Sequence, residues 1–422
     1  MRVQLLRVIG ARTTNIVLED EPVEIGREAQ IALDDPEASR RHARVEPVES
    51  GWQIVDLGSH NGTYVDGARV TTARLQHGSV IRAGKTLIVF VDAQLPDGRM
   101  PLPALGSKIV GDSIAALRLH GEIDLVAAQP VSVLVLGETG VGKELVAQEI
   151  HRRSRRSGAF VAVNCAAIAR ELAESELFGH VPGAFTGAAR ASDGLFVAAE
   201  GGTLFLDEVG ELPPDLQPKL LRALATGEIR PVGSSNARTV DVRVVAATLR
   251  DLDEAVRADT FRADLMNRLA GWKITVPTLR ERRDDIFAIA SLFLRRHGNL
   301  ALSTDAIEAL LVHDWPGNVR ELERTIAAAA VRAQAARSGV ELAHLPTELA
   351  ARLSGRAIAD APRTAPILVP AGAMPTREEL TALLEQMDGN VARVAEHLGK
   401  DRQQIYRWAK RYGLDVESFR RT

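Results

Sequence analysis

The chain has 422 residues, a formal net charge of −3 and a hydrophobic content of 45%. At about 100–200 residues per domain this length predicts two to four domains, and the apolar content excludes a chain that is disordered throughout. No apolar run approaches the ~18 residues of a membrane span, and the first residues show no secretory pattern. A single cysteine, Cys165, excludes an intrachain disulfide framework. We therefore expect a cytoplasmic protein without a membrane partner, whose balanced charge still allows one small DNA-binding module.

Two stretches, 94–105 and 354–375, are rich in turn-forming or small residues and are interpreted as linkers. They leave an N-terminal piece over 1–95, a middle piece over 106–345 and a C-terminal piece over 375–422. The first contains short strand-like segments and no convincing helix. The middle piece alternates apolar strands with helical stretches, which predicts a parallel α/β sheet, and turns helical from about residue 283. The third piece contains three short amphipathic helices.

A glycine-rich turn, GETGVGKE, follows an apolar strand of the middle piece and precedes a helical stretch. Such a turn points backbone N–H groups and a helix N-terminus at an anion, and Lys143 is placed to meet the β- and γ-phosphates of a nucleotide. The strict pattern has Ser or Thr where this chain has Glu144, so Mg²⁺ must be held by other groups. An ordinary glycine turn is the alternative. The nucleotide-binding candidates are Gly137, Glu138, Thr139, Gly140, Val141, Gly142, Lys143 and Glu144.

A second element of the middle piece is the apolar segment GTLFLDE, which ends in two carboxylates. Asp207 can hold Mg²⁺, and Glu208 can polarise the attacking water. A paired Asp-Glu at a strand end is more often a solvated rim. Following a phosphate-binding loop, however, the pair predicts an NTPase.

The middle piece resembles the AAA+ domain of bacterial sigma-54-dependent activators (enhancer-binding proteins) in the sequences ESELFGH, GAFTGA and GLFVAAEGGTLFLDEVGELP. The resemblance implies an ATPase that works as an oligomer, from dimer to hexamer. It also implies that the GAFTGA loop touches sigma-54 and is moved by the nucleotide cycle. By composition alone the loop is a run of small residues with one aromatic side chain, which suits a partner contact. Its members are Gly183, Ala184, Phe185, Thr186, Gly187 and Ala188.

The same resemblance assigns roles to four further polar residues. Asn164 matches the residue that couples Glu208 to the nucleotide state. Arg262 and Arg268 match arginines that reach the ATP of a neighbouring subunit, which would make hydrolysis depend on a ring. Arg320 matches the lid arginine that senses the γ-phosphate. From the residues alone, Arg262 and Arg268 also suit ion pairs on a helix face.

One position departs from the family pattern. After the segment VRVVAAT the family has Asn or His, whereas this chain has Leu249. A leucine side chain cannot donate a hydrogen bond to water or phosphate. We therefore expect hydrolysis or its coupling to be altered, and ATPase activity to persist because Lys143, Asp207 and Glu208 are present.

Residues 376–415 indicate helix, helix, turn and helix, with apolar spacing that supports packed helices. The last helix is rich in Arg and Gln, which pair bidentately with guanine and adenine, and its other basic side chains can bind phosphate. A solvated helix bundle fits the pattern as well. The segment resembles the Fis-type helix-turn-helix that ends sigma-54 activators, which implies a dimeric unit on a palindromic upstream site in double-stranded DNA. The DNA-contact candidates are Arg402, Gln403, Gln404, Arg407, Lys410 and Arg411.

The N-terminal piece contains three short blocks, GR, SRRH and HNGT, each of which is weak alone. In this order on a strand-rich piece they resemble a forkhead-associated (FHA) domain, a β-sandwich whose loops bind phosphothreonine peptides. The resemblance implies that Arg27 pairs bidentately with the phosphate and that Ser39 hydrogen-bonds it beside Arg40. It implies that Asn61 fixes the peptide backbone and that His42 braces the loops. An FHA fold that has lost phosphopeptide binding is the alternative.

Together these parts predict a multidomain protein with a β-sandwich, an α/β P-loop AAA+ domain with a helical lid, and an all-α helix-turn-helix. The expected function is ATP-driven remodelling of sigma-54 RNA polymerase from upstream DNA, gated by phosphothreonine recognition, with ATP and Mg²⁺ as cofactors. A nucleotide-binding but weakly hydrolysing scaffold or repressor is one alternative. A AAA+ remodeller of another target is a second, and the intact GAFTGA loop argues against it.

Overall fold

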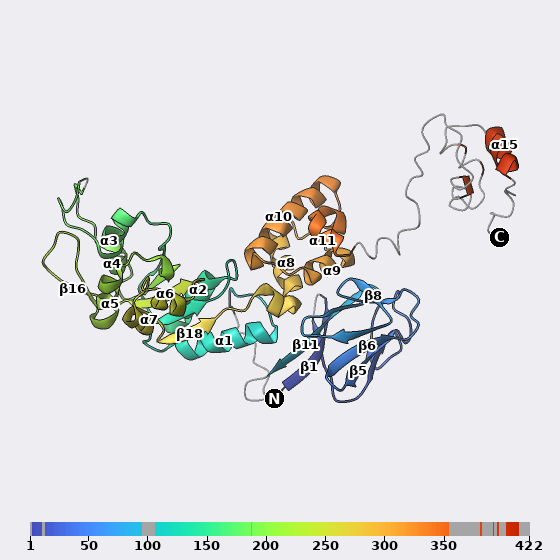
Figure 1. Ribbon diagram of the computed structural model, residues 1–422, viewed down its shortest axis with the longest axis horizontal. Coiled ribbons are helices and arrows are strands. Elements are labelled where there is room, and N and C mark those ends of the chain that lie inside the picture. The colour runs from blue at the N-terminus through green and yellow to red at the C-terminus, as the bar shows by residue number, and fades with distance from the viewer. Residues whose placement is uncertain are drawn as a thin grey trace. The chain divides into compact units, whose positions relative to one another are not determined.

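The computed structural model describes residues 2–10, 13–94, 106–186, 188–353, 380–381, 391, 395 and 402–412. The chain divides into two compact units, residues 1–352 and residues 353–422 (Figure 1). Residues 95–105 of the first expected linker, the whole of the second and most of the expected C-terminal helices lie outside the described residues. No helix of the described part is long and apolar enough to cross a membrane.

The N-terminal residues form a sandwich of two mainly antiparallel sheets, which confirms the expected β-sandwich. One sheet has the order β2-β1-β11-β10-β7-β8 and the other β4-β3-β5-β6-β9. Alternate side chains of a strand point to opposite faces, and the inward set, including Leu6 and Phe90 from one sheet and Ile25 and Trp52 from the other, forms one buried core. The strands are β1 Arg2–Ile9, β2 Thr14–Val17, β3 Val23–Gly26, β4 Ile31–Ala32, β5 Ala43–Val48, β6 Gly51–Asp56, β7 Thr63–Val65, β8 Ala68–Val70, β9 Thr72–Leu75, β10 Val80–Ala83 and β11 Thr86–Gln94.

The middle piece is built on a five-stranded parallel sheet with the order β13-β14-β17-β12-β18. Its strands are apolar throughout because both faces are covered. In β14, for example, Leu204 and Leu206 join one buried cluster and Phe205 joins the other. The strands are β12 Val133–Leu136, β13 Phe160–Asn164, β14 Thr203–Asp207, β17 Arg243–Thr248 and β18 Trp272–Thr275.

Helices cover the two faces of this sheet. Side chains of α1 (Ile114–Ala127) and α2 (Lys143–Ser154) pack on one face. The other face is covered by α3 Arg170–Phe178, α4 Gly194–Ala198, α5 Gln217–Thr226, α6 Leu252–Arg257 and α7 Ala263–Leu269. A short 3-10 helix, η2 (Val209–Glu211), follows β14, and a two-stranded ribbon is formed by β15 (Glu228–Ile229) and β16 (Arg238–Thr239).

The helical lid begins slightly earlier than predicted, at residue 279. It consists of the 3-10 helix η3 (Leu279–Asp285), α8 (Ile286–Arg295), α9 (Thr304–Val312), α10 (Asn318–Ala336), η4 (Leu342–His344) and α11 (Thr347–Ala351), and Figure 1 shows α8 to α11 grouped together. The turn before α10 is fixed by Trp315, which is fully buried and whose indole N–H donates to the carbonyl of Leu310 at 2.8 Å. The turn therefore sets where α10 starts relative to the rest of the lid.

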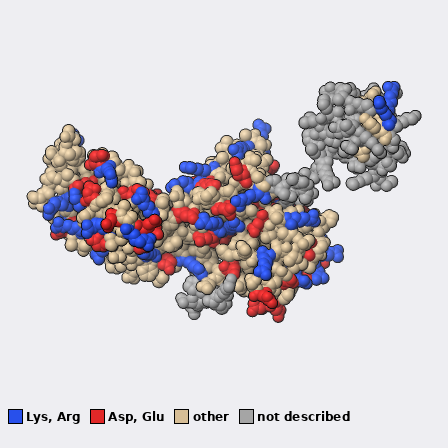
Figure 2. Space-filling view, viewed as in Figure 1, with Lys and Arg blue, Asp and Glu red and all other residues tan. Residues whose placement is uncertain are grey.

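In the second unit the structure describes one helix, α15 (Arg402–Tyr412), at the position of the expected last helix. Ile405, Trp408 and Ala409 are buried and share one helix face, whereas Arg402, Arg407 and Arg411 are exposed. Figure 2 shows basic side chains at this helix, while basic and acidic groups intermingle over the visible face of the first unit. The side chains of Gln403 and Lys410 lie outside the described residues, so the helix-turn-helix stays a prediction.

Candidate nucleotide site and its partner surfaces

The expected phosphate-binding loop lies between β12 and α2. Gly140 and Gly142 have φ angles of +77° and +103°, a left-handed conformation that glycine adopts without steric cost. Lys143 is the first residue of α2, so the N–H groups of that helix end face the loop. The Lys143 ammonium is buried and donates to the carbonyl of Gly137 at 3.0 Å. The strand–turn–helix arrangement expected from the sequence is therefore present.

Asp207 and Glu208, at the end of β14, lie beside this loop. Glu208 Oε1 is 3.7 Å from Lys143 Nζ, and Glu208 Oε2 accepts a hydrogen bond from the backbone N–H of Leu249 at 3.2 Å. Glu208 has a φ angle of +51°, an uncommon conformation for a residue with a side chain. Backbone strain of this kind concentrates at functional sites. The structure thus brings together the lysine and the acids that the sequence predicted for catalysis.

The donor set suits a Mg²⁺ ion that arrives with a nucleotide. Among the residues that the structure describes, no group of three or more His, Cys, Asp or Glu side chains could hold a metal ion. Mg²⁺ at phosphate sites is commonly bound by one or two carboxylates together with phosphate oxygens and water. Asp207, whose Oδ1 accepts the N–H of Glu208 at 3.1 Å, fits that mode. Glu144 is exposed and accepts a hydrogen bond from Gln148 of its own helix at 3.1 Å.

The lid contacts the loop through two residues that the sequence analysis did not select. Asn318, fully buried at the start of α10, donates from Nδ2 to Glu138 Oε2 and to the carbonyl of Thr139, both at 3.1 Å. Arg280 of η3 donates to Glu138 Oε2 at 3.0 Å. Hydrogen bonds from Arg280 and then from Asn318 hold the pKa of the Glu138 carboxyl below its ordinary value. The only sequence signal was an asparagine after the turn residues Trp-Pro-Gly.

Arg320 lies beside the loop, where the resemblance placed the lid arginine. Its backbone N–H donates to the carbonyl of Gly140 at 3.3 Å. A Cβ atom at Gly140 would lie 2.3 Å from the carbonyl oxygen of Gly317, so only glycine allows this approach of loop and lid. The exposed Arg320 side chain therefore starts from a backbone that is in direct contact with the phosphate-binding loop.

A cavity of about 390 Å³ adjoins the loop. Its walls are largely apolar and come from several separate segments, which include residues 107–110, the loop with the start of α2, and α8. Apolar cavities of this size suit a planar group such as a nucleobase. Among the lining residues are Ile109, Val141, Leu145, Ile289 and Phe293. Sequence reasoning missed the cavity because no single segment carries its pattern.

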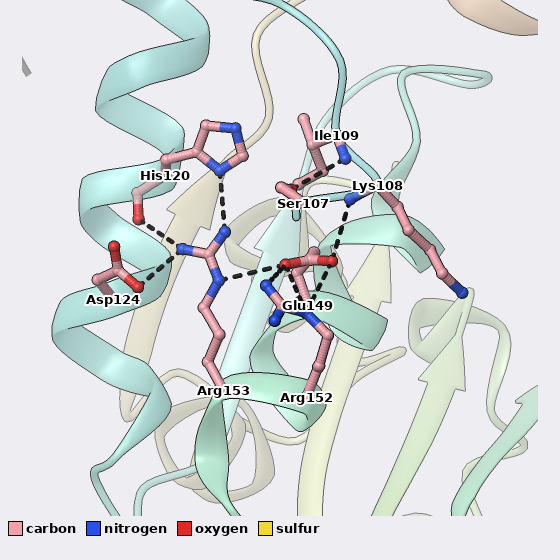
Figure 3. A network of polar contacts seen from close by, with 8 residues as sticks. All are labelled: Ser107, Lys108, Ile109, His120, Asp124, Glu149, Arg152 and Arg153. Atoms are coloured by element: carbon pink, nitrogen blue, oxygen red, sulfur yellow. Dashed lines mark hydrogen bonds and ion pairs between the residues drawn. The ribbon is translucent and has the colours of Figure 1, made fainter. Parts of the chain in front are cut away.

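The wall formed by residues 107–110 is fastened to α2 through Glu149 (Figure 3). The buried Glu149 carboxylate accepts the backbone N–H of Lys108 at 3.2 Å and pairs with Arg152 at 2.7 Å and Arg153 at 3.2 Å. Burial raises the pKa of Glu149, but these hydrogen bonds outweigh it and leave that pKa below its ordinary value. Arg153 also pairs with Asp124 of α1 at 2.7 Å. The chain entering the domain is thus held in place at the cavity.

The remaining residues expected at the site have local partners. Asn164 ends β13 opposite Asp207 in the strand register, and its Oδ1 accepts the N–H of Ala166 at 2.9 Å. Arg262 pairs with Asp264 at 2.7 Å, and Arg268 donates to the carbonyl of Leu224 at 2.9 Å. Both arginines are exposed. Their action on a neighbouring subunit stays a prediction.

The single cysteine packs next to the site and has no reactive character. Cys165 is buried, and its backbone N–H donates to the carbonyl of Asp207 at 2.9 Å. Burial, and then the charge of Asp207, raises the pKa of the thiol to about 12. A thiol with such a pKa stays protonated near neutral pH and is a poor nucleophile.

The GAFTGA loop projects from a base that is closed by an antiparallel bridge between His180 and Ser192. Within it the N–H of Gly183 donates to the carbonyl of Ala188 at 2.8 Å, so the segment is a compact turn. The Phe185 ring lies edge-on to the His180 ring, with centroids 5.0 Å apart, and remains 37% exposed. Ala184 and Thr186 complete the described part of the tip, whereas Gly187 lies outside the described residues.

In the sandwich, the three expected blocks meet on loops at one end of the strands. Arg27 Nε donates to the carbonyl of Ala38 at 2.7 Å, and Asn61 Nδ2 donates to the carbonyl of Glu37 at 2.8 Å. The hydroxyl of Ser39 accepts the backbone N–H of His60 at 3.0 Å. The loops that carry Arg27, Ser39 and Asn61 are therefore joined. Arg40 is exposed and lies 3.3 Å from Glu28.

His42 braces these loops from below. It is fully buried, its Nδ1 accepts the N–H of Ser39 at 3.0 Å, and its Nε2 lies 3.2 Å from the carbonyl of Gly62. The Nδ1 acceptor role requires a neutral ring with its proton on Nε2. Burial lowers the pKa of His42 and favours this neutral form.

Family profiles match three parts of the chain. One described as a sigma-54 interaction domain matches residues 109–275, an FHA domain profile matches 23–84, and an AAA+ ATPase lid profile matches 280–360. These matches agree with the sandwich, the parallel sheet and the helical lid described above.

Two regulators illustrate the similarity. The chain is 46% identical over 328 residues to the regulatory protein LuxO of Vibrio cholerae, which covers 73% of this chain and 62% of LuxO. It is 44% identical over 373 residues to the nitric oxide reductase transcription regulator NorR1 of Cupriavidus necator, covering 83% and 71%. The chain thus spans less than two thirds of the length of LuxO.

Among solved structures, NtrX from Brucella abortus in complex with ATP aligns with a TM-score of 0.53 and 32% identity. The alignment covers 73% of this chain and 70% of that protein. The architecture, the matched domains and the relatives agree. The chain therefore belongs to the family of sigma-54-dependent transcriptional regulators and combines an FHA domain with an AAA+ ATPase domain.

Proposed function

We propose that this protein hydrolyses ATP in an oligomeric ring to remodel the closed complex of sigma-54 RNA polymerase. The observation that carries the proposal is the meeting of Lys143, Asp207 and Glu208 at the phosphate-binding loop. It is joined by a loop, 183–188, that presents Phe185 to solvent. We propose that the protein acts in the cytoplasm, because its proposed targets, DNA and RNA polymerase, are found there.

The residues at the loop suggest how the chemistry is divided. Backbone N–H groups of the loop and of the α2 N-terminus would cradle the phosphates. Lys143, now 3.7 Å from Glu208, would exchange that carboxylate for phosphate and free Glu208 to orient and deprotonate water. Asp207 would hold Mg²⁺, which supplies positive charge to the phosphate oxygens. The apolar cavity would hold the adenine, and the ATP complex of the similar NtrX protein supports this choice.

The positions of two exposed arginines support the ring. Arg262, which precedes α7, pairs with Asp264, and Arg268 of α7 donates to the carbonyl of Leu224. An arginine that stabilises transferring phosphate from a neighbouring subunit must be exposed on its own subunit. Both residues meet this condition. We propose that they complete the site across the subunit interface, in a dimer-to-hexamer assembly.

Input and targeting are assigned to the two ends of the chain. The joined loops of Arg27, Ser39 and Asn61 would bind a phosphothreonine protein, with Arg40 beside them, and so gate the ATPase. The exposed arginines of α15 would contact upstream double-stranded DNA as part of a Fis-type helix-turn-helix. The family membership of the chain supports both assignments.

A substitution at the tip of the GAFTGA loop tests the coupling of hydrolysis to polymerase. Thr186→Ala is expected to abolish sigma-54-dependent transcription and to leave ATP turnover within about twofold, because Thr186 is exposed and is not among the residues proposed to act on ATP. Asn236→Ala, an exposed polar change in the neighbouring loop, is the matched control and should leave both activities intact. Transcription by Thr186→Ala at the level of the control would refute the assignment.

A second function, a nucleotide-binding scaffold or repressor with weak hydrolysis, is favoured by one observation. The side chain of Leu249, at the end of β17, is 57% exposed and offers no hydrogen-bond donor to the phosphate. A steady-state ATPase assay separates the two functions, with Glu208→Gln as the inactive reference. Turnover no higher than that of the reference would establish the scaffold.

A further inference from the structure

The seven-residue helix η3 lies between the FHA domain and the phosphate-binding loop and contacts both. On the FHA side its main anchor is Arg7 of β1, which is fully buried. Arg7 Nε forms an ion pair with Asp284 Oδ2 at 3.1 Å, and Arg7 Nη1 donates to the carbonyl of Asp112 at 3.0 Å. A buried charge is tolerated only with its partners in place, so such a pair specifies one docking geometry.

Two further contacts join η3 to the hairpin between β9 and β10. The ring Nε2 of His77 donates to the carbonyl of Glu281 at 3.3 Å, and Arg283 Nη1 donates to the carbonyl of Gly78 at 3.3 Å. Arg283 also lies 3.8 Å from Asp66. The FHA domain therefore touches η3 through backbone carbonyls as well as through charges.

The lid is fastened to the same domain at a second place. Arg82 of β10 is nearly buried and pairs with Glu308 of α9 at 2.7 Å, with Asp305 also in contact. Arg82 follows closely on the hairpin that reaches η3. The FHA domain and the lid are thus joined by ion pairs of Arg7, Arg82 and Arg283.

On its opposite side η3 holds the phosphate-binding loop. Arg280 pairs with Glu138 at 3.0 Å, and the buried Arg282 donates to the carbonyl of Val141 at 3.3 Å. Residues of η3 therefore contact both partners. Arg280 and Arg282 reach the loop, and Glu281 and Asp284 reach the FHA domain. Arg283 contacts the FHA domain and also pairs with Asp314 of the lid at 2.9 Å.

The backbone of η3 departs from helical geometry at Arg282. Arg282 has non-helical angles, φ −136° and ψ 49°, which break the helix into two short turns. Hydrogen bonds in a 3-10 helix have poorer geometry than those in an α-helix, so contacts on its two sides contribute to the conformation of η3.

We propose that η3 is a connector through which the FHA domain and the phosphate-binding loop each sense the state of the other. The proposal rests on the proposed function of the loop as the ATP site. The coupling is reciprocal. A change at the FHA hairpin alters the affinity for nucleotide, and nucleotide binding alters the conformational equilibrium of the hairpin. The FHA domain then acts on the geometry of the site itself.

Hydrogen exchange on the full chain tests the connector with a non-hydrolysable ATP analogue as the probe. In the unmodified protein the analogue should slow exchange in residues 137–143 and also in the hairpin, residues 76–83. In Arg283→Ala the analogue should still slow exchange in residues 137–143 but should no longer slow it in residues 76–83. His77→Ala, which removes one exposed side chain, provides a milder variant should Arg283→Ala fold poorly. Arg44→Ala removes an ion pair within β5 that does not touch η3, and should keep both changes.

The affinities of the unmodified chain and its variants for the same analogue provide a second test. Arg283→Ala and Arg280→Ala are expected to change the Kd non-additively when combined, by at least about fivefold, because both act through η3. Additive effects, together with exchange changes confined to residues 137–143, would overturn the connector and leave the ATP site standing. Failure of the unmodified chain to bind the analogue would instead refute the proposed function, and the connector with it.

Discussion

The backbone N–H of Leu249 donates to Glu208 Oε2 at 3.2 Å, while the Leu249 side chain is exposed. The residue that follows β17 therefore holds the carboxylate through its main chain. The family resemblance implies Asn or His at this position, and such a side chain would add a donor near the expected γ-phosphate. Every residue except proline has a backbone N–H group, so this hydrogen bond to Glu208 does not depend on which side chain stands at position 249.

Two substitutions of Leu249 should have different effects on hydrolysis. Leu249→Ala keeps the backbone donor and is expected to leave turnover within about twofold, as exposed side chains usually contribute little. Leu249→Asn adds a donor and is expected to raise turnover about tenfold, the effect of one hydrogen bond to a charged group. Phosphate release at saturating ATP measures both. A large loss in Leu249→Ala would show that the side chain, and not the backbone, supports Glu208.

The exposed arginines predict complementation between inactive subunits. Arg268→Ala should lower turnover by about 10³–10⁵, and Arg262→Ala should behave alike, because each removes a charge from the neighbouring site. Mixing Arg268→Ala with Glu208→Gln creates interfaces that hold an intact arginine and an intact glutamate.

The mixture should therefore regain a measurable fraction of turnover, although each variant alone is inactive. Arg222→Ala, which removes an exposed pair with Glu228, is the matched control and should stay near the unmodified rate. Co-assembled mixtures that remain inactive would argue that Arg268 serves its own subunit.

His42 makes the FHA loops sensitive to acid. Its pKa in the folded chain lies below the ordinary value of 6.5, because burial disfavours the charged ring. The unfolded state consequently binds the proton more readily, so the stability linked to His42 is complete above pH 6.5 and falls as the pH is lowered through the folded pKa. One proton limits this loss to about 1.4 kcal/mol per pH unit.

Hydrogen exchange of residues 37–42 between pH 5 and pH 8, corrected for the intrinsic rate, measures the effect. Protonation of Nδ1 removes the acceptor of the Ser39 N–H, so protection of that amide should fall in acid. His42→Gln can keep an acceptor without titrating and should flatten the dependence. Protection of Ser39 that is constant over this range in the unmodified chain would contradict the role assigned to His42.

The order of motifs was sufficient to predict most of the fold and which residues meet at the candidate site. The loop that carries Lys143 follows β12 and Asp207 ends β14, and the carboxyl ends of such parallel strands meet at one edge of the sheet. The three FHA blocks could be located in the sequence for a similar reason, since each lies at or near a loop between short strands. Local sequence patterns identified these residues, and the sheet topology brought them together.

The contacts of the lid were not predictable in this way. Asn318 meets Glu138, which is 180 residues earlier in the chain, and Arg280 meets the same carboxylate from another segment. Neither residue belongs to a periodic pattern, and from the sequence alone each side chain would be expected at the surface. Their meeting depends on how the lid packs against the loop, which no local sequence pattern specifies.

Asn318 provides the sharpest test of the lid contact. Its Oδ1 accepts the N–H of Leu279 at 2.9 Å, and its φ angle is +52°. Removing the amide leaves buried polar groups without partners, which costs about 1–3 kcal/mol. Asn318→Ala should therefore lower the thermal unfolding temperature and weaken nucleotide binding about tenfold or more.

The positive φ angle offers a second explanation, because alanine is strained in that conformation whereas glycine is not. Asn318→Gly separates the two causes, since it relieves the strain and still lacks the amide. If the bonds to Glu138 and Thr139 matter, glycine and alanine should weaken nucleotide binding equally. If glycine restores the affinity of the unmodified chain in a titration with a non-hydrolysable analogue, Asn318 serves the turn and not the nucleotide loop.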